Sequence, residues 1–156
     1  IELLPVFLLM PVTGAVADRF PRRRVAALAH TVIAVATALI ALVTWRASSV
    51  APIYALLAVV GAGRAFAMPA AATILPRLLS PAEFANANAW ISSTFQLAAV
   101  TGPALAGALI AGTGGASLGL AVAAAGQLLF VSQLARLPEV HPLPGAVTPG
   151  LDGVFE

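Results

Sequence analysis

Residues 84–135 read FANANAWISSTFQLAAVTGPALAGALIAGTGGASLGLAVAAAGQLLFVSQLA, and none of these side chains is charged. A helix needs about 20 apolar residues to cross the roughly 30 Å hydrocarbon core of a bilayer, so this stretch is long enough to cross twice. The glycine-rich break at residues 112–115 predicts a tight turn between the two spans. The stretch therefore indicates a helical hairpin inside a membrane.

Two more apolar stretches precede this hairpin. The first, Val25–Trp45, lies uncharged between Arg24 and Arg46, and the second, residues 47–76, contains only Arg64 as a charged residue. No segment shows the alternation of a strand, so the predicted fold class is all-α, a polytopic membrane helix bundle over residues 1–136. The predicted spans are 25–45, 52–75, 86–111 and 116–135, with a partial span at 1–12.

The two ends of the sequence differ in character. Residues 1–12 are apolar but rise only about 18 Å as a helix, so we interpret them as the end of a span in an internal segment of a longer chain. Residues 137–156 contain four prolines among glycines, which predicts a linker that leaves the membrane on the cytoplasmic side.

Composition excludes several classes of protein. The chain is 60% apolar and 9% charged, whereas soluble domains are about 45–50% apolar and about 25% charged. A net charge of +2 gives no basic face for nucleic acid, and the absence of cysteine excludes disulfides and thiolate zinc sites. No nucleotide loop, metal cluster or nucleophile–base pair is present, so we predict no enzyme activity, no catalytic residue, no cofactor and no metal.

The arginines predict the orientation, because loops on the cytoplasmic side of membranes carry an excess of them. All eight basic residues are arginine, and the loops at 13–24 and 76–85 together with the final exit hold most of them. Arg46 lies on the opposite side and Arg64 lies within a span. The arginines predicted to be cytoplasmic are Arg19, Arg22, Arg23, Arg24, Arg77 and Arg136.

Local signals mark where helices begin and pack. Ser80 and Glu83 form a capping-box pattern with Pro81 at the first helical position, which predicts a helix start at Ser80. Gly63, among alanines and Gly61, predicts a narrow packing surface on the preceding span, and Pro69 is expected to bend or end that span.

The loop GAVADRFPRRR, residues 14–24, carries the most specific pattern. Three arginines at a helix start oppose the helix dipole, so something else must hold them there. Anchoring to lipid phosphates accounts for the arginines but not for Asp18, an acid that can form a charge-assisted network with them or dock on a neighbouring helix. Both interpretations stay open on the residues alone.

This loop resembles the signature between the second and third helices of the major facilitator superfamily, in which a glycine is followed by Asp-Arg and then a basic cluster. Pro21 stands where the family usually has glycine and Val16 where it often has leucine. The resemblance implies that the loop latches the cytoplasmic side of a transporter. The matching residues are Gly14, Ala17, Asp18, Arg19, Arg22 and Arg23.

Residues 101–107, TGPALAG, are similar to the glycine-proline motif that exporters of this family carry in the fifth helix, with Ala106 at one glycine position. The motif residues Gly102, Pro103 and Gly107 are expected to serve helix packing. With the surrounding sequence they resemble bacterial efflux members of the enterobactin and macrolide exporter group. The resemblance covers Ile1 to about Leu137 and implies helices two to six, a partial N-terminal half of a twelve-helix major facilitator fold, followed by the start of the segment between the halves.

Polar residues within the spans are candidates for a translocation path. Arg64 lies near the middle of its span, where a charge costs about 2.5–3.5 kcal/mol, so it needs a protein partner or a wet cavity. Each candidate also has a structural interpretation. Arg64 could pair with backbone carbonyls, and Glu2 could be only the start of a truncated segment. The side chains of Asn88, Ser92 and Gln96 could join helices to one another. His30 is interpreted as an interfacial residue. The candidates are Glu2, Arg64, Asn88, Ser92 and Gln96.

Two functions fit these features. The first is a secondary transporter working by alternating access, an exporter of small amphipathic drug-type or siderophore-type molecules, with protons as the coupling ion, in the plasma membrane (bacterial inner membrane). The second is a non-transporting membrane scaffold or sensor on the same helices. The expected partners are the lipid bilayer, a small-molecule substrate and the remainder of the same chain, with no nucleic acid.

The arginine distribution makes the orientation testable. Single cysteines introduced in the Arg22 loop and at Gly114 of the full-length protein should differ in labelling by a membrane-impermeant reagent added outside cells. We expect labelling at Gly114 and none near Arg22, because the arginine-rich loop stays in the cytoplasm. The reverse pattern would contradict the predicted orientation.

Overall fold

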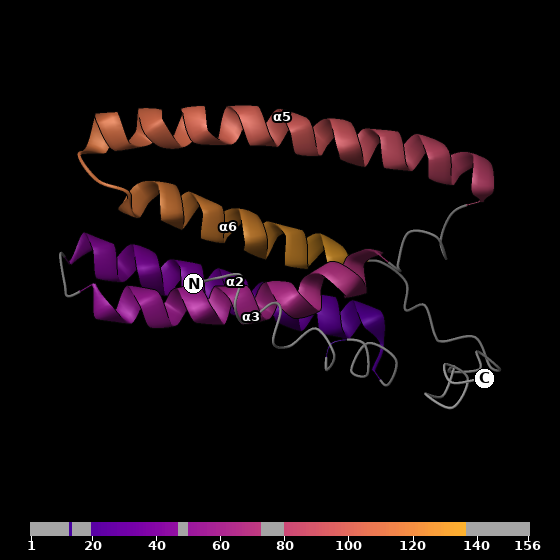
Figure 1. The fold of residues 1–156 in the computed structure, drawn as a ribbon, viewed down its shortest axis with the longest axis horizontal. Coiled ribbons are helices and arrows are strands. Elements are labelled where there is room, and N and C mark those ends of the chain that lie inside the picture. The colour runs from indigo at the N-terminus through magenta and orange to yellow at the C-terminus, as the bar shows by residue number, and fades with distance from the viewer. Residues whose placement is uncertain (1–12, 14–19, 47–49, 73–79, 137–156) are drawn as a thin grey trace, which may run out of the picture.

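The computed structural model describes residues 13, 20–46, 50–72 and 80–136. These residues form four long helices and no strand, in the order α2 (Arg22–Trp45), α3 (Ala51–Ala72), α5 (Pro81–Thr113) and α6 (Ser117–Leu134), as Figure 1 shows. Each is long and apolar enough to cross a membrane. The predicted all-helical membrane fold is therefore confirmed for the described residues.

Helix α5 begins at the predicted capping box. Ser80 donates a hydrogen bond from its backbone N–H to Glu83 Oε2 at 3.0 Å, and its hydroxyl donates to the same oxygen at 2.6 Å. Pro81, at the first helical position, has no N–H that would need a partner. The start of α5 is thus set by three neighbouring residues, Ser80, Pro81 and Glu83.

The hairpin between α5 and α6 turns at glycine, as the sequence predicted. Gly114 has φ 71°, in the left-handed region that side chains with a Cβ rarely adopt. Its N–H donates to the carbonyl oxygen of Ile110 at 2.8 Å, which satisfies one carbonyl at the end of α5. The turn therefore depends on a residue without a side chain.

Helix α2 is the centre of the described structure, because it packs against α3 and also against α6. Five of its buried residues recur every three or four positions and so form one stripe along the helix, and Ala34 and Ala41 are buried beside it. Val60 and Ala67 of α3 complete the main core. The stripe consists of Ala26, Ala29, Ile33, Ala36 and Ile40.

Helices α2 and α3 approach closely at Gly63. A Cβ atom placed on Gly63 would lie 2.7 Å from Ile33 Cγ1 and 3.3 Å from the carbonyl oxygen of Ala29. The first distance is shorter than real contacts allow, so a larger residue would push the helices apart. The predicted small-residue surface of α3 is confirmed here. Helix α3 also continues through Pro69 to Ala72.

Helix α5 contacts only α6 among the described helices. It has 33 residues, which correspond to about 50 Å of helix, more than the roughly 30 Å hydrocarbon core. In Figure 1 it extends well past the beginning of α2 and the end of α6. We call that end of the structure the arginine end, because Arg23 and Arg24 begin α2 there and Arg136 follows α6. The opposite end, which holds Gly114, is the turn end.

The close approach at Gly63 gives a stability prediction. Gly63→Ala should lower the free energy of unfolding by about 1–3 kcal/mol, as overpacking a tight interface does. The measurement is thermal unfolding of the full-length protein in detergent. Gly126→Ala is the matched control, because a Cβ there meets nothing within 4 Å. Adding Ile33→Ala to Gly63→Ala should recover part of the loss, and equal effects of both glycine substitutions would contradict the prediction.

Candidate functional site

The loop predicted to latch the transporter is described only in part. Gly14, Asp18 and Arg19 lie outside the described residues, and so does Glu2. Helix α2 begins at Arg22, and the side chain of the next residue, Arg23, is half-buried. The chain enters the helix through Pro21, whose carbonyl accepts hydrogen bonds from the N–H groups of Arg24 at 2.8 Å and Val25 at 3.1 Å.

The electrostatics of this helix start are unusual. The first turn of α2 holds no acidic residue, so the cations of Arg23 and Arg24 lie at the positive pole of the helix dipole. Such an arrangement is stabilised by anions that come from elsewhere, either carboxylates or lipid phosphates. The positive charges at the arginine end therefore favour binding of carboxylates or lipid phosphates there.

Arg64 lies on α3 directly after Gly63. Its side chain is exposed, whereas Gly63 and Ala65 on either side of it are buried. Counted at 1.5 Å per residue, it lies about 20 Å from the start of α3 at the turn end. A guanidinium at this depth is costly against lipid, so it requires water or other protein groups around it.

The polar stripe of α5 lies in the part of that helix nearest the arginine end. Asn88, Ser92 and Gln96 are all exposed and recur every four residues, so they share one face. Gln96 lies about 27 Å from Gly114 along the helix, and Asn88 about 39 Å. Within the described residues α3 makes no contact with α5. The structure therefore does not bring Arg64 and this stripe together.

The two glycines of the glycine-proline motif of α5 face open space in the described structure. A Cβ atom on Gly102 or Gly107 would meet nothing within 4 Å among these residues. The helix continues through Pro103 without a break. Its predicted packing role stays a prediction.

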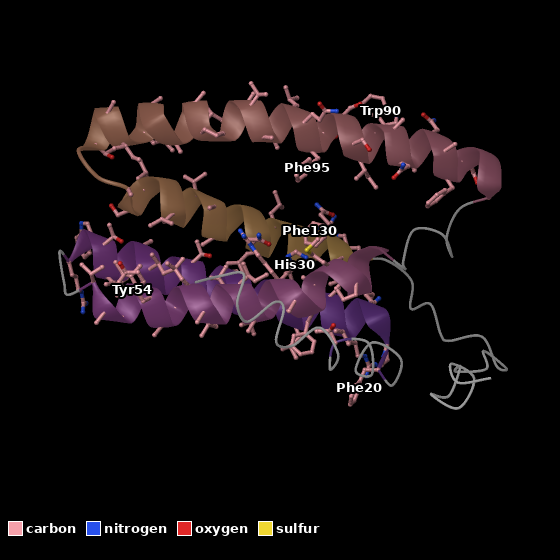
Figure 2. All side chains as sticks on the ribbon, viewed as in Figure 1. Phe20, His30, Tyr54, Trp90, Phe95 and Phe130 are labelled. Carbon is pink, nitrogen blue, oxygen red and sulfur yellow. The ribbon has the colours of Figure 1, made fainter. Side chains whose placement is uncertain are left out.

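A polar contact that the sequence did not suggest joins α2 to α6. His30 Nδ1 lies 2.8 Å from Oε1 of Gln127, which is 97 positions later in the chain, and both side chains are half-buried. The rings of His30 and Phe130 pack with centroids 4.5 Å apart and planes inclined by 58° (Figure 2). One available signal was that each of these apolar helices carries a long hydrogen-bonding side chain within its span.

Several other hydroxyl groups in the helices form hydrogen bonds within their own helix. The hydroxyl groups of Thr31, Thr37 and Thr44 each donate to the carbonyl oxygen four residues earlier in α2, at 2.8 Å. These bonds stay within one helix and need no partner helix. The His30–Gln127 bond differs because it fixes two helices relative to each other.

A comparison with protein-family models gives a match to the Major Facilitator Superfamily over residues 2–152. The chain belongs to the Major Facilitator Superfamily. Proteins of this superfamily are membrane transporters rather than enzymes, and the four apolar helices fit a segment of its helix bundle. Neither the curated proteins nor the solved structures contain a match. The superfamily predicted from the loop motif is thus confirmed, and the exporter group within it stays a prediction.

For a member of the Major Facilitator Superfamily, a site that recognises a substrate combines apolar surface with a few convergent polar groups. An open groove of about 440 Å³ lies between α2 and α3, but Arg24 is the only charged residue in its lining. This groove fits apolar packing better than recognition. Its lining consists of Phe20, Arg24, Val25, Leu28, Ala29, Val32, Ala62, Gly63 and Phe66.

We looked for a metal-binding site among the described residues. They contain no group of three or more histidine, cysteine or carboxylate side chains that could hold a metal ion. The polar groups that remain for this Major Facilitator Superfamily member are Arg64, the α5 stripe and the His30–Gln127 pair.

Proposed function

We propose that this transporter works by alternating access and exports small amphipathic molecules of the drug or siderophore type, driven by a proton gradient across the bacterial inner membrane. The superfamily match over residues 2–152 carries this proposal. The likeness of residues 101–107 to the exporter motif supports the direction of transport. The arginine loops at 13–24 and 76–85 and the segment after α6 are assigned to the cytoplasm.

The exposure of the polar residues favours transport over the scaffold alternative. A scaffold would be expected to bury Arg64, Asn88, Ser92 and Gln96 against other helices, but all four are exposed in the described structure. Polar side chains within the hydrocarbon layer, such as Arg64 and Gln96, need protein groups, water or a substrate beside them. This requirement is what a translocation path provides.

The experiment that tests the proposal uses inside-out membrane vesicles containing the full-length protein. In these vesicles export appears as accumulation of a compound in the lumen, and an acidic lumen supplies the proton gradient. We expect at least one member of a panel of fluorescent amphipathic dyes to accumulate, and the accumulation to stop when a protonophore is added. If no dye moves under any gradient, the scaffold alternative is favoured.

Asp18 is proposed to act on conformational switching rather than on substrate binding. Its place beside the arginine cluster is at the membrane surface, some 15 Å from the midplane. Asp18→Asn should slow dye accumulation about tenfold, corresponding to a shift of ~1.4 kcal/mol in the two-state equilibrium, with dye affinity changed less than a few-fold. The control is Asp152→Asn, which removes an acid from the linker. A large loss of affinity at an unchanged rate would refute the assignment.

Glu2 and Arg64 are proposed to face a shared central cavity. Glu2 lies twelve residues before Gly14, about 18 Å along a helix, and Arg64 lies well inside α3. Neutralising either residue should abolish export or change its specificity while membrane insertion persists, because each charge then loses its partner at depth. Arg46→Gln, at the end of α2, serves as the control. Unchanged export by a folded Glu2→Gln, Arg64→Gln double variant would remove both residues from the path.

A further inference from the structure

Two adjoining apolar grooves follow one side of the α2–α3 pair, and neither has a part in the proposed function. The first, of about 440 Å³, extends from Phe20 and Arg24 at the arginine end (Figure 2) to Val32. The second, of about 360 Å³, also contacts Val32 and continues to Leu39. From Arg24 to Leu39 the two cover about 22 Å along α2. We call them together the α2–α3 track.

The walls of the track come from one face of each helix. On α3 they include Leu56, Val59 and Phe66. Apart from Arg24, the described lining contains a single polar side chain, Thr31, whose hydroxyl donates to a carbonyl oxygen of its own helix. The track therefore favours an apolar occupant along its length, with a cation at its beginning. The exposed wall residues of α2, which recur every three or four positions, are Leu28, Val32, Val35 and Leu39.

The charge at the mouth of the track is positive. Residues 14–24 contain four arginines and one aspartate, so the net charge of this stretch is +3 with Asp18 counted. The described residues of α2, α3 and α6 include no carboxylate. Arg24 already interacts with another group of the protein. A guanidinium has five N–H donors, however, so it can keep that interaction and still donate to a phosphate.

We propose that the α2–α3 track binds an acyl chain of an anionic phospholipid, and that Arg24 binds the phosphate of the same lipid. The length fits, because one leaflet of the hydrocarbon core is about 15 Å deep and a chain anchored at Arg24 therefore ends within the track. The charge fits as well, because arginines near the membrane surface attract anionic lipids. Binding is noncovalent, so no bond forms or breaks.

A phospholipid uses both features of the track at once. An apolar helix would fill the walls without using the positive charge at the mouth. A free phosphate would bind at the mouth without filling the walls. The proposal goes beyond the proposed function, since it requires neither a substrate nor a direction of transport.

The test measures which lipid contacts the track, through quenching of tryptophan fluorescence by bromine. The full-length protein carries Leu28→Trp, and its native tryptophans, including Trp45 and Trp90, are changed to Phe. Vesicles contain equal amounts of phosphatidylglycerol and phosphatidylcholine, and only one of the two lipids carries bromine on its acyl chains. We expect phosphatidylglycerol to associate with this reporter about fivefold more strongly than phosphatidylcholine, which corresponds to ~1 kcal/mol for one arginine near the surface.

Leu129→Trp, with the native tryptophans again changed to Phe, is the matched reporter outside the track. Leu28 lies about 9 Å from the start of α2 and Leu129 about 8 Å from the end of α6. Their exposed fractions are 68% and 63%. Both brominated lipids should quench the Leu129→Trp reporter equally. Adding Arg24→Gln to Leu28→Trp should remove most of the preference, whereas adding Arg46→Gln, beyond the far end of α2, should leave it unchanged.

Four results would overturn the proposal. Equal quenching of Leu28→Trp by both lipids would indicate ordinary bilayer contact without selection of a headgroup. The same preference at both reporters would indicate a general attraction of phosphatidylglycerol to the protein. Absence of quenching at Leu28→Trp would indicate that another part of the chain or a second copy covers the track. A preference that survives Arg24→Gln would remove Arg24 from the site. The comparison of the two reporters decides the proposal even if Arg24→Gln does not fold.

Discussion

The hydrocarbon interior of a bilayer offers no hydrogen-bond partner, and this constraint accounts for the architecture of the chain. Every backbone N–H and C=O at that depth must be satisfied within the protein, which leaves long helices as the solution for apolar stretches of this length. Side chains obey the same constraint. The hydroxyl groups of the α2 threonines donate hydrogen bonds to carbonyl oxygens of their own helix, whereas His30 forms a hydrogen bond with Gln127 of α6.

Where lipid is as apolar as the side chains, helices associate through close packing rather than through exclusion of water. The α2–α3 interface follows this rule, since Gly63 lets the helices approach until Ile33 fills the space that a Cβ atom would need. The alanine-rich stripe of α2 works in the same way. The same logic explains why α5 can leave nearly all of its apolar surface exposed in the described structure without penalty in a membrane.

Features coded by a few adjacent residues could be predicted from the sequence, because local chemistry decides them. The capping box at Ser80 and Glu83 and the turn at Gly114 belong to this class. The partnership of His30 with Gln127 could not, since it depends on how two helices that are apolar on all sides rotate against each other. Gln127 indicates that α6 makes a polar contact, but without an amphipathic face the sequence does not show that the partner lies on α2. The placement of Arg64 relative to Gln96 depends on the same missing information.

The length of α5 means that one continuous helix experiences two solvents. Counted back from Gly114, the roughly 30 Å of the hydrocarbon core ends near Thr94, and Trp90 lies one turn further along α5. Tryptophan is enriched at the boundary between headgroups and hydrocarbon. The turns before Trp90, with the capped start at Ser80, then lie among hydrated headgroups, and the turns after it lie among acyl chains. The same substitution, for example an alanine changed to a charged residue, would be harmless in the first segment and expensive in the second.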